Sequence, residues 1–297
     1  MKNVAASVRS SLLNISRQKG EPFEGLLEYY AMGRFLYRLT ESTYREKFIL
    51  KGAQVFRIWG AESFRPTRDL DLLSFGDPTE RAIHAIFSEI IEMPLSQEDG
   101  LEWTHIKTGP IREDAAYGGV RAVLTAHLAG ARLNLQIDVG FGDTITPTAI
   151  EAEWLNLLDF PVARLLIYPP ETVIAEKLEA AVQLDINNSR MKDFYDLNWL
   201  ARHRSFDSEI LQKAIALTFE RRGTDLPTEA PFALTQAFAT DPAKQIQWNA
   251  FLRKNRLAAN SLEEVITKLH QFLGPILVEK NLNKTWNPES GWTEKSP

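Results

Sequence analysis

The stretch from residue 50 to residue 77 places the strongest constraint on the fold of this chain. It reads Leu-Lys-Gly-Ala-Gln-Val-Phe-Arg-Ile-Trp-Gly-Ala-Glu-Ser-Phe-Arg-Pro-Thr-Arg-Asp-Leu-Asp-Leu-Leu-Ser-Phe-Gly-Asp. Residues 68–74 have strand character, so Asp69 and Asp71 point to one face and the leucines beside them point into a core. Two such carboxylates repel each other unless a cation lies between them. Their hard oxygens suit Mg²⁺, which usually keeps waters and bridges to substrate phosphates. The same pattern is also typical of solvated acids on an edge strand.

Composition limits the class of protein. A chain of 297 residues exceeds the usual size of one domain, and 44% hydrophobic with 25% charged residues is ordinary for a globular protein. The absence of cysteine excludes disulfides, thiolate metal sites and cysteine nucleophiles. A net charge of −5 argues against a single global basic field, although a local basic groove is compatible with it. No apolar run suggests a membrane span or a secretory signal, so we expect a cytoplasmic protein.

Periodicity predicts an α+β fold, mixed α/β in the first half and helical in the second. We expect residues 1–165 to form an α/β domain, 166–283 a helical domain and 284–297 a polar tail. The predicted strands are 68–74, 101–108, 119–128 and 131–139, the last two forming a hairpin. The predicted helices are 5–19, 24–47, 79–91, 171–184, 189–202, 207–221, 230–237, 243–254 and 260–274.

A third carboxylate ends the last predicted strand. Asp138 lies on the polar face of that strand, immediately before a Gly-x-Gly break. Such a residue is a candidate third metal ligand, and it can also accept the proton of an attacking hydroxyl. A solvated residue at a strand end is the structural alternative. Asp143, farther along, is expected to satisfy backbone donors in a turn.

The helical half contributes further candidates. Lys177 lies on or beside an apolar stripe, where a lysine seldom lacks a partner. It could hold a triphosphate as a point charge, or its stem could pack while its head reaches water. Downstream, Asp193 and Asp196 lie beside another apolar stripe, where they could also be acids favoured by the helix dipole. Arg190 and Lys192 are close enough in sequence to pair with these acids or with phosphate.

Five blocks of sequence together resemble one family, the AbiEii/AbiGii-type nucleotidyltransferase toxins of the polymerase-β-like superfamily. The resemblance covers roughly residues 25–205. The blocks are Lys51-Gly52-Ala53, Arg65-Pro-Thr-Arg-Asp-Leu-Asp-Leu, Ile137-Asp-Val-Gly-Phe-Gly-Asp, Glu171-Thr-Val-Ile-Ala-Glu-Lys and Arg190-Met-Lys-Asp-Phe-Tyr-Asp-Leu. The resemblance implies a polymerase-β-like mixed sheet with flanking helices, followed by an all-helical C-terminal domain.

The resemblance also implies roles for individual residues. Asp69 and Asp71 match the metal-binding pair, and Lys177 and Asp193 match two motif residues implicated in activity. Lys177→Ala should therefore abolish transfer with little change in melting temperature. The implied nucleotide-binding set is Lys51, Gly52, Ala53, Gln54, Arg68 and Lys177. Many family members have a hydroxyl residue in the turn, where this chain has Gly52-Ala53-Gln54, so Gln54 would have to donate a hydrogen bond instead.

The function implied is Mg²⁺-dependent transfer of a nucleoside monophosphate from an NTP to RNA, with tRNA 3′ ends as the acceptor class. A cognate antitoxin, a winged-helix transcriptional regulator, is the implied partner. Candidate phosphate contacts are Arg202-His203-Arg204, Arg221-Arg222 and Arg253-Lys254-x-Arg256, which are equally typical of helix ends.

Two alternatives remain open. One is an aminoglycoside-type enzyme with a small-molecule acceptor, for which an acidic pocket would be expected. The other is a non-catalytic binding module, suggested by the altered turn.

Overall fold

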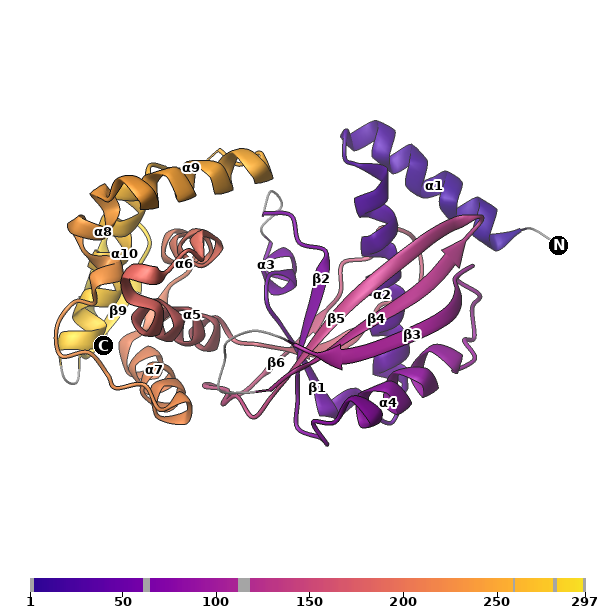
Figure 1. Cartoon of the computed structure of the whole chain (residues 1–297), viewed down its shortest axis with the longest axis horizontal. Helices are drawn as coiled ribbons and strands as arrows, with labels where there is room; N and C mark the ends of the chain where they lie inside the picture. Colours follow the sequence, from indigo (N-terminus) through magenta and orange to yellow (C-terminus); the bar gives the residue numbers. More distant parts are fainter. Residues whose placement is uncertain (1–2, 61–64, 112–117, 259, 280–281, 296–297) are drawn as a thin grey trace. The chain divides into compact units, whose positions relative to one another are not determined.

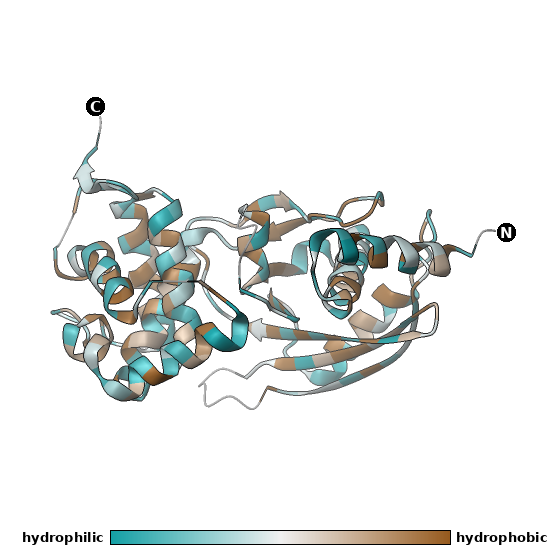
Figure 2. Ribbon diagram, turned by 90° about the horizontal axis from the view of Figure 1, so that it is seen from above, coloured by the Kyte–Doolittle hydropathy of each residue, from teal (hydrophilic) through white to brown (hydrophobic). Residues whose placement is uncertain are grey.

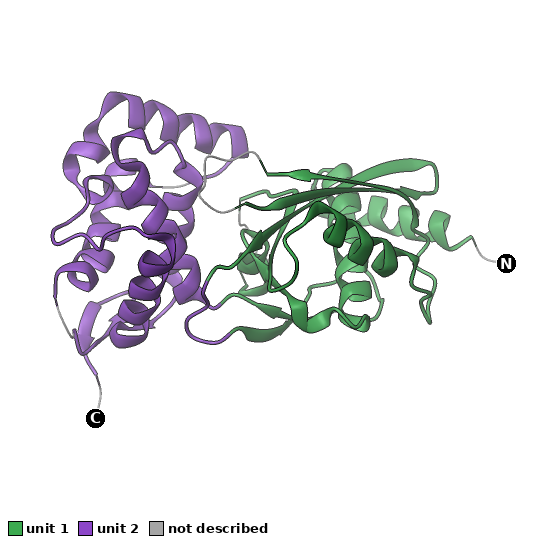
Figure 3. Ribbon diagram, turned by 60° about the horizontal axis from the view of Figure 1, so that its bottom comes forward, with its two compact units in different colours: residues 1–143, 149–168 green, residues 144–148, 169–297 purple. Residues whose placement is uncertain are grey.

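The computed structural model describes residues 3–60, 65–111, 118–258, 260–279 and 282–295. The chain divides into two compact units (Figure 3). Unit 1 comprises residues 1–143 and 149–168, and unit 2 comprises residues 144–148 and 169–297. The division after residue 168 lies close to the boundary that the sequence predicts near residue 165. The α+β class predicted from the sequence is confirmed.

Unit 1 is built around a mixed sheet with helices (Figure 1). Its described helices are α1 (Val4–Lys19), α2 (Phe23–Glu41), α3 (Gln54–Ile58) and α4 (Glu80–Glu92), with a 3₁₀ turn at Arg45–Lys47. Its described strands are β1 (Phe48–Lys51), β2 (Asp69–Ser74), β3 (Glu102–Pro110), β4 (Val120–Leu128), β5 (Ala131–Phe141), β6 (Ile150–Glu153) and β7 (Arg164–Ile167). The predicted helix 24–47 therefore ends early, and the short strands β1, β6 and β7 were not among the predicted strands.

The strands of unit 1 lie in the order β3-β4-β5-β2-β1-β7-β6. β2 pairs with β5, and β1 with β7, in parallel, whereas the other neighbours are antiparallel. The strand with the two aspartates is thus central, not an edge strand. Its apolar residues Leu70 and Leu72 are fully buried, as the alternation predicts. Figure 2 shows this alternation of polar and apolar residues along the strands of the sheet.

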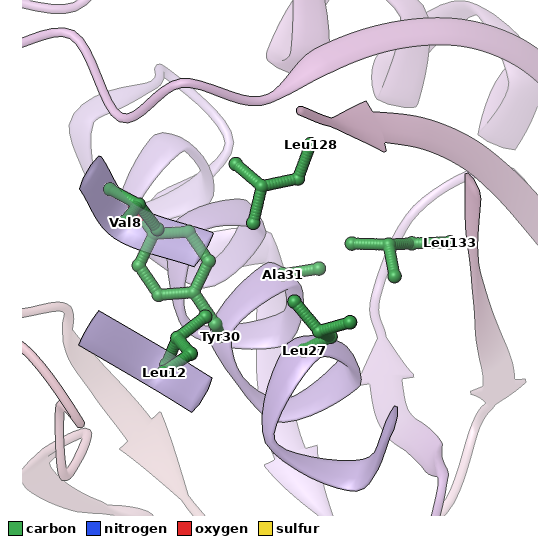
Figure 4. Close-up of a cluster of buried hydrophobic side chains, with 7 residues drawn as sticks. All are labelled: Val8, Leu12, Leu27, Tyr30, Ala31, Leu128 and Leu133. Carbon is green, nitrogen blue, oxygen red and sulfur yellow. The ribbon is translucent and has the colours of Figure 1, made fainter. Parts of the chain in front are cut away.

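One face of the sheet carries the core of unit 1. Figure 4 shows how α1 and α2 contribute Val8, Leu12, Leu27, Tyr30 and Ala31, which meet Leu128 and Leu133 of the hairpin β4–β5. The predicted helix at 79–91 begins at an N-cap, because the Thr79 hydroxyl accepts a hydrogen bond from the Ala82 amide. With one face occupied by helices, the polar residues of the same strands lie on the other face.

A buried ion cluster fixes α2 in unit 1. Asp99 is 2% exposed and pairs with Arg34 and Arg38 of α2, both almost fully buried. The Arg34 guanidinium also donates to the Pro161 carbonyl at 2.9 Å and stacks over Tyr37 and Phe160. Burial raises the pKa of the neighbouring Tyr30 hydroxyl well above its ordinary value, and the charge of Asp99 adds to this shift.

Unit 2 is mainly helical. Its described helices are α5 (Pro170–Leu184), α6 (Met191–His203), α7 (Ser208–Arg222), α8 (Gln236–Thr240), α9 (Pro242–Asn255) and α10 (Leu262–Val278), with 3₁₀ turns at Asp185–Asn187 and Phe232–Leu234. The predicted helix 230–237 is therefore a 3₁₀ turn followed by the short α8. In the described part of the chain, no helix combines the length and the apolar character needed to cross a membrane.

The expected polar tail is instead folded. β9 (Lys284–Asn287) pairs with β10 (Gly291–Glu294) and with the short β8 (Phe206–Asp207). Trp286 is 1% exposed and packs in an aromatic cluster with Phe272 and Trp292. Its indole N–H donates to the Ala201 carbonyl at 2.8 Å. Although the sequence around them is polar, Trp286 and Trp292 supply enough apolar surface to pack this segment into the fold.

Candidate active site

Four charged side chains lie in one row across the centre of the unit 1 sheet. Lys51 of β1 is in register with Asp71 of β2, and Asp71 is in register with Asp138 of β5. Asp138 is in turn paired with Arg121 of β4. Neighbouring strands lie about 4.8 Å apart, and residues in register point to the same face. The sequence prediction that Asp138 faces the aspartates from a neighbouring strand agrees with this register. Asp69, two residues before Asp71 on the same face, is in register with Gln136.

The turn that follows β1 lies directly against Asp71. Gly52 has φ of +71°, a conformation that favours glycine. A Cβ atom built on Gly52 would lie 2.0 Å from Asp71 Oδ2 and 2.6 Å from Asp71 Cγ, far inside van der Waals contact. The lysine-glycine turn and the aspartate strand, which are about twenty residues apart in the sequence, are therefore a single structural feature. Any side chain at position 52 would displace the Asp71 carboxylate.

Lys51 is held at one end of the row by Asp143. Its ammonium lies 2.8 Å from Asp143 Oδ2, with both side chains less than one-fifth exposed, and 5.0 Å from the centre of the Tyr168 ring. Asp143 is thus more than the turn residue that the sequence suggests, because from the segment after β5 it forms an ion pair with Lys51 of β1. The pair presents a cation beside the Gly52 turn, where an anionic substrate group would be recognised.

Arg121 is held at the other end of the row by Asp138. Its Nε donates to Asp138 Oδ1 at 2.8 Å and its Nη2 donates to Oδ2 at 2.7 Å. Such a bidentate contact fixes the plane of a carboxylate. Sequence reasoning missed Arg121, although the two-residue turn of the predicted hairpin sets the register that places it opposite Asp138.

The turn residues Ala53 and Gln54 do not point toward the row. Ala53 is 3% exposed and Gln54 is completely buried. The Gln54 amide donates to the sulfur of Met32 on α2 at 3.2 Å, so its side chain belongs to the core. The interpretation that Gln54 replaces a family hydroxyl as a phosphate donor is therefore corrected. The side chains of Ala53 and Gln54 are therefore parts of the core, unlike that of Lys51, which belongs to the row.

Arg68 immediately precedes the aspartate pair and is directed toward α2. Its guanidinium lies 3.4 Å from Glu28 and 3.7 Å from Glu24, and its side chain is 64% exposed. Burial raises the pKa of Glu28, Arg68 lowers it, and the charges of Glu24 and Asp69 raise it further. Glu28 is thus a titratable neighbour of Asp69 that no sequence motif indicates. The helical spacing of Glu24 and Glu28 places them on one face of α2, but it does not indicate that Arg68 lies against that face.

The donor set suits a divalent metal in one respect. Asp69 and Asp71 offer hard oxygens on one face, which match Mg²⁺ that is held by one or two carboxylates and completed by water and phosphates. Among the described residues, no group of three or more histidine, aspartate or glutamate side chains is placed to hold a metal ion. Asp138, predicted as a third ligand, has both oxygens engaged by Arg121.

A second cluster of charges lies in unit 2, where α5 meets α6. The Lys177 ammonium lies 2.6 Å from Asp193 and 2.8 Å from Asp196, and Arg190 lies 2.5 Å from the other oxygen of Asp193. Both aspartates are nearly inaccessible, and Lys177 is 13% exposed. Lys177 is therefore not a lysine whose head simply reaches water. The prediction that Arg190 pairs with these acids is correct, whereas Lys192 is exposed.

The cluster keeps Asp193 ionised. Burial alone would raise the pKa of Asp193, but the charges of Lys177 and Arg190 outweigh this effect and hold its pKa well below the ordinary value of 3.8. The buried Asp193 carboxylate needs Lys177 and Arg190 to compensate its charge. Because Lys177 lies on α5 and Asp193 on α6, this compensation requires that the two helices pack together.

Comparison with known proteins gives one family match. Residues 34–268 match the family model described as nucleotidyl transferase AbiEii toxin, type IV TA system. This range includes every candidate residue above except Glu24 and Glu28. No curated protein matches the chain.

Two solved structures from Helicobacter pylori are similar. The JHP933 protein is 17% identical, with 82% of this chain and 88% of that chain covered and a TM-score of 0.49. The second, described as a candidate nucleotidyltransferase, is 16% identical, with 82% and 91% covered and a TM-score of 0.49.

Proposed function

The chain belongs to the AbiEii family of nucleotidyl transferase toxins of type IV toxin–antitoxin systems. We propose that it transfers a nucleoside monophosphate from an NTP to the 3′ end of a tRNA. The acceptor hydroxyl attacks the α-phosphorus, the bond from that phosphorus to the bridging oxygen breaks, and pyrophosphate leaves with the electron pair. The observation that carries the proposal is the in-register row of Lys51, Asp71, Asp138 and Arg121 beside the Gly52 turn.

Asp69 and Asp71 are the residues that would hold Mg²⁺, since they share one face of a central strand. A bound divalent ion supplies charge neutralisation to the triphosphate and its leaving group. Lys51, fixed by Asp143, provides a cation that can orient the phosphates beside the turn. Gly52 leaves room for the Asp71 carboxylate, and the absence of a side chain would let its backbone approach a phosphate closely.

Asp138 is the residue to which we assign the proton of the acceptor hydroxyl. Arg121 occupies one lone pair on each of its oxygens, and a carboxylate oxygen has a second lone pair available. Arg121 would then keep the carboxylate plane aligned while the proton is transferred. From the family motif, we also assign Lys177 and Asp193 a part in transfer.

The family context implies an antitoxin partner, and we propose a winged-helix transcriptional regulator for that role. The same proposal places the protein in the cytoplasm, where NTPs and tRNA are available. Co-expression with the product of the adjacent gene, followed by a growth assay, tests whether that product neutralises the chain.

Incubation with NTPs labelled at the α-phosphate, Mg²⁺ and total RNA tests the reaction. We expect label in tRNA on a denaturing gel, and at least a hundredfold slower transfer by Asp71→Asn, because each metal ligand should contribute several kcal/mol to the barrier and 1.36 kcal/mol is tenfold in rate. Asp159→Asn, the same change in an exposed loop of unit 1, is the matched control.

The other outcomes of this experiment are informative. Label in a small polycationic acceptor, with none in RNA, would favour an aminoglycoside-type enzyme. NTP binding without transfer to any acceptor would favour a binding module. Full activity of Asp71→Asn would contradict the assignment of the aspartate pair.

A further inference from the structure

The polar face of the unit 1 sheet continues well beyond the charged row. Three further in-register rows follow it along β3, β4 and β5. They are Lys107, Val123 and Gln136; then His105, Thr125 and Asn134; then Glu102, His127 and Arg132. From Asp138 to Arg132 the face extends for six residues of β5, or about 20 Å. This distance would accommodate a short stretch of single-stranded nucleic acid.

The charge of this extension is opposite to that of the chain as a whole. The chain carries a net charge of −5, yet these three rows contain Lys107, Arg132 and two histidines against a single acid, Glu102. Neither Lys107 nor Arg132 makes an ion pair within the part of the chain that the structure describes. Their charges are therefore available to an anionic partner.

This face is accessible in unit 1. The described contacts of α1, α2 and α4 with the sheet involve the opposite face, where Leu128, Leu133 and Ile106 are buried. Figure 1 shows these helices with the strands of unit 1. Lys107, His105, Arg132 and Asn134 are exposed.

We propose that this extension of the sheet, defined by Lys107, His105, His127, Arg132, Asn134 and Gln136, binds the single-stranded end of the RNA acceptor. Lysine and arginine contact phosphates, histidine and arginine planes stack on unpaired bases, and amides bond to base edges. The charged row lies at one end of this face, so a strand bound along it would present its end to Asp138. The direction of binding rests on the proposed function, whereas the binding itself does not.

Charge reversal tests the proposal. The test variant is Lys107→Glu with Arg132→Glu, and the matched control is Arg17→Glu with Arg81→Glu, two exposed cations on α1 and α4 that make no ion pair in the described chain. Both replace two cations with two carboxylates, so both alter the overall charge equally. The probe is a fluorescein-labelled single-stranded RNA ending in the tRNA acceptor sequence, and the readout is anisotropy as a function of salt.

We expect the test variant to bind this RNA at least tenfold more weakly, with a salt slope reduced by about 1.4 for two lost phosphate contacts on a single strand. The control should bind as the wild type does. Binding of a fluorescent NTP with Mg²⁺ should be the same in all three proteins. Equal RNA binding by the test and control variants, or no RNA binding by the wild type, would overturn the proposal.

Failure of this inference can be separated from failure of the proposed reaction. A wild-type protein that binds RNA through this face but transfers no nucleotide to it would contradict the reaction alone. A test variant that labels RNA as efficiently as the wild type would contradict the binding face alone.

Discussion

The backbone of Gly52 lies so close to the carboxylate of Asp71 that a Cβ atom at position 52 would come within 2.0 Å of Asp71 Oδ2. The turn after β1 and the central strand β2 therefore depend on each other. The positive φ of Gly52 accounts for part of the requirement for glycine, and the contact with Asp71 accounts for the rest.

Gly52→Ala should reduce both stability and transfer. The positive φ is expected to cost about 1 kcal/mol, and the clash should displace Asp71 and slow transfer at least tenfold. Gly130→Ala is the matched control, because Gly130 has φ of +81° and a Cβ atom at that position would have no other atom within 4 Å. Thermal unfolding and NTP transfer would be measured for both variants. Equal losses of transfer in the two variants would show that the contact with Asp71 has no functional role.

Transfer should require an arginine at position 121, because its planar guanidinium makes two hydrogen bonds to Asp138. Arg121→Gln removes the bidentate contact and is expected to slow transfer at least tenfold, because the Asp138 carboxylate is no longer held in one plane. Arg121→Lys should recover only part of the rate, since a lysine restores the charge but not the planar pair of donors. Steady-state kinetics with varied NTP would show the loss mainly in kcat. Full recovery by lysine would reduce the role of Arg121 to charge alone.

The sequence predicted one side of the sheet, from β3 to β2, better than the other side, from β1 to β6. Alternation around Asp69 and Asp71 was sufficient to assign a face, because period-2 burial needs only local information. The pairing of Arg121 with Asp138 was also accessible, since the Ala129-Gly130 turn fixes the register of β4 and β5.

Other features depend on contacts between residues far apart in the sequence. β6 and β7 are four residues each, too short for a periodic signal, and β7 is placed by its parallel pairing with β1. The burial of Gln54 follows from the approach of Met32 on α2, which no local pattern indicates. The tail was misinterpreted for the same reason, because Trp286 becomes a core residue only through its packing on Phe272.

Lys177→Ala should destabilise unit 2, contrary to the expectation from sequence alone. Removing the ammonium would leave Asp193 and Asp196 as buried charges with less compensation, which typically costs about 3–5 kcal/mol. Urea denaturation would measure the loss. The variant Lys177→Met with Asp193→Asn and Asp196→Asn should regain much of the stability, because the buried charges are removed together.

The same variants distinguish a structural from a functional role for Lys177. If the triple variant is stable but inactive, the cluster is required for transfer and not only for folding. A Lys177→Ala protein with unchanged stability would contradict the importance of the ion cluster that the structure shows.

The contribution of Asp193 to stability should depend on pH in a defined direction. Its pKa in the folded protein lies below the ordinary value of 3.8, because Lys177 and Arg190 outweigh the effect of burial. The unfolded state therefore takes up the proton first as the pH falls. The stabilisation by Asp193 is fully present above the unfolded pKa and is lost progressively as the pH falls from there to the lower pKa of the folded state. Urea denaturation of the wild type and Asp193→Asn between pH 3 and pH 7 measures the difference in unfolding free energy.

We expect the difference in unfolding free energy between the two proteins to be constant from about pH 5 to pH 7 and to narrow below about pH 4, near the unfolded pKa. Asp159→Asn, the same change at an exposed position, is measured in parallel as the matched control. A difference between wild type and Asp193→Asn that stays constant down to pH 3 would mean that the Asp193 carboxylate contributes nothing through its charge.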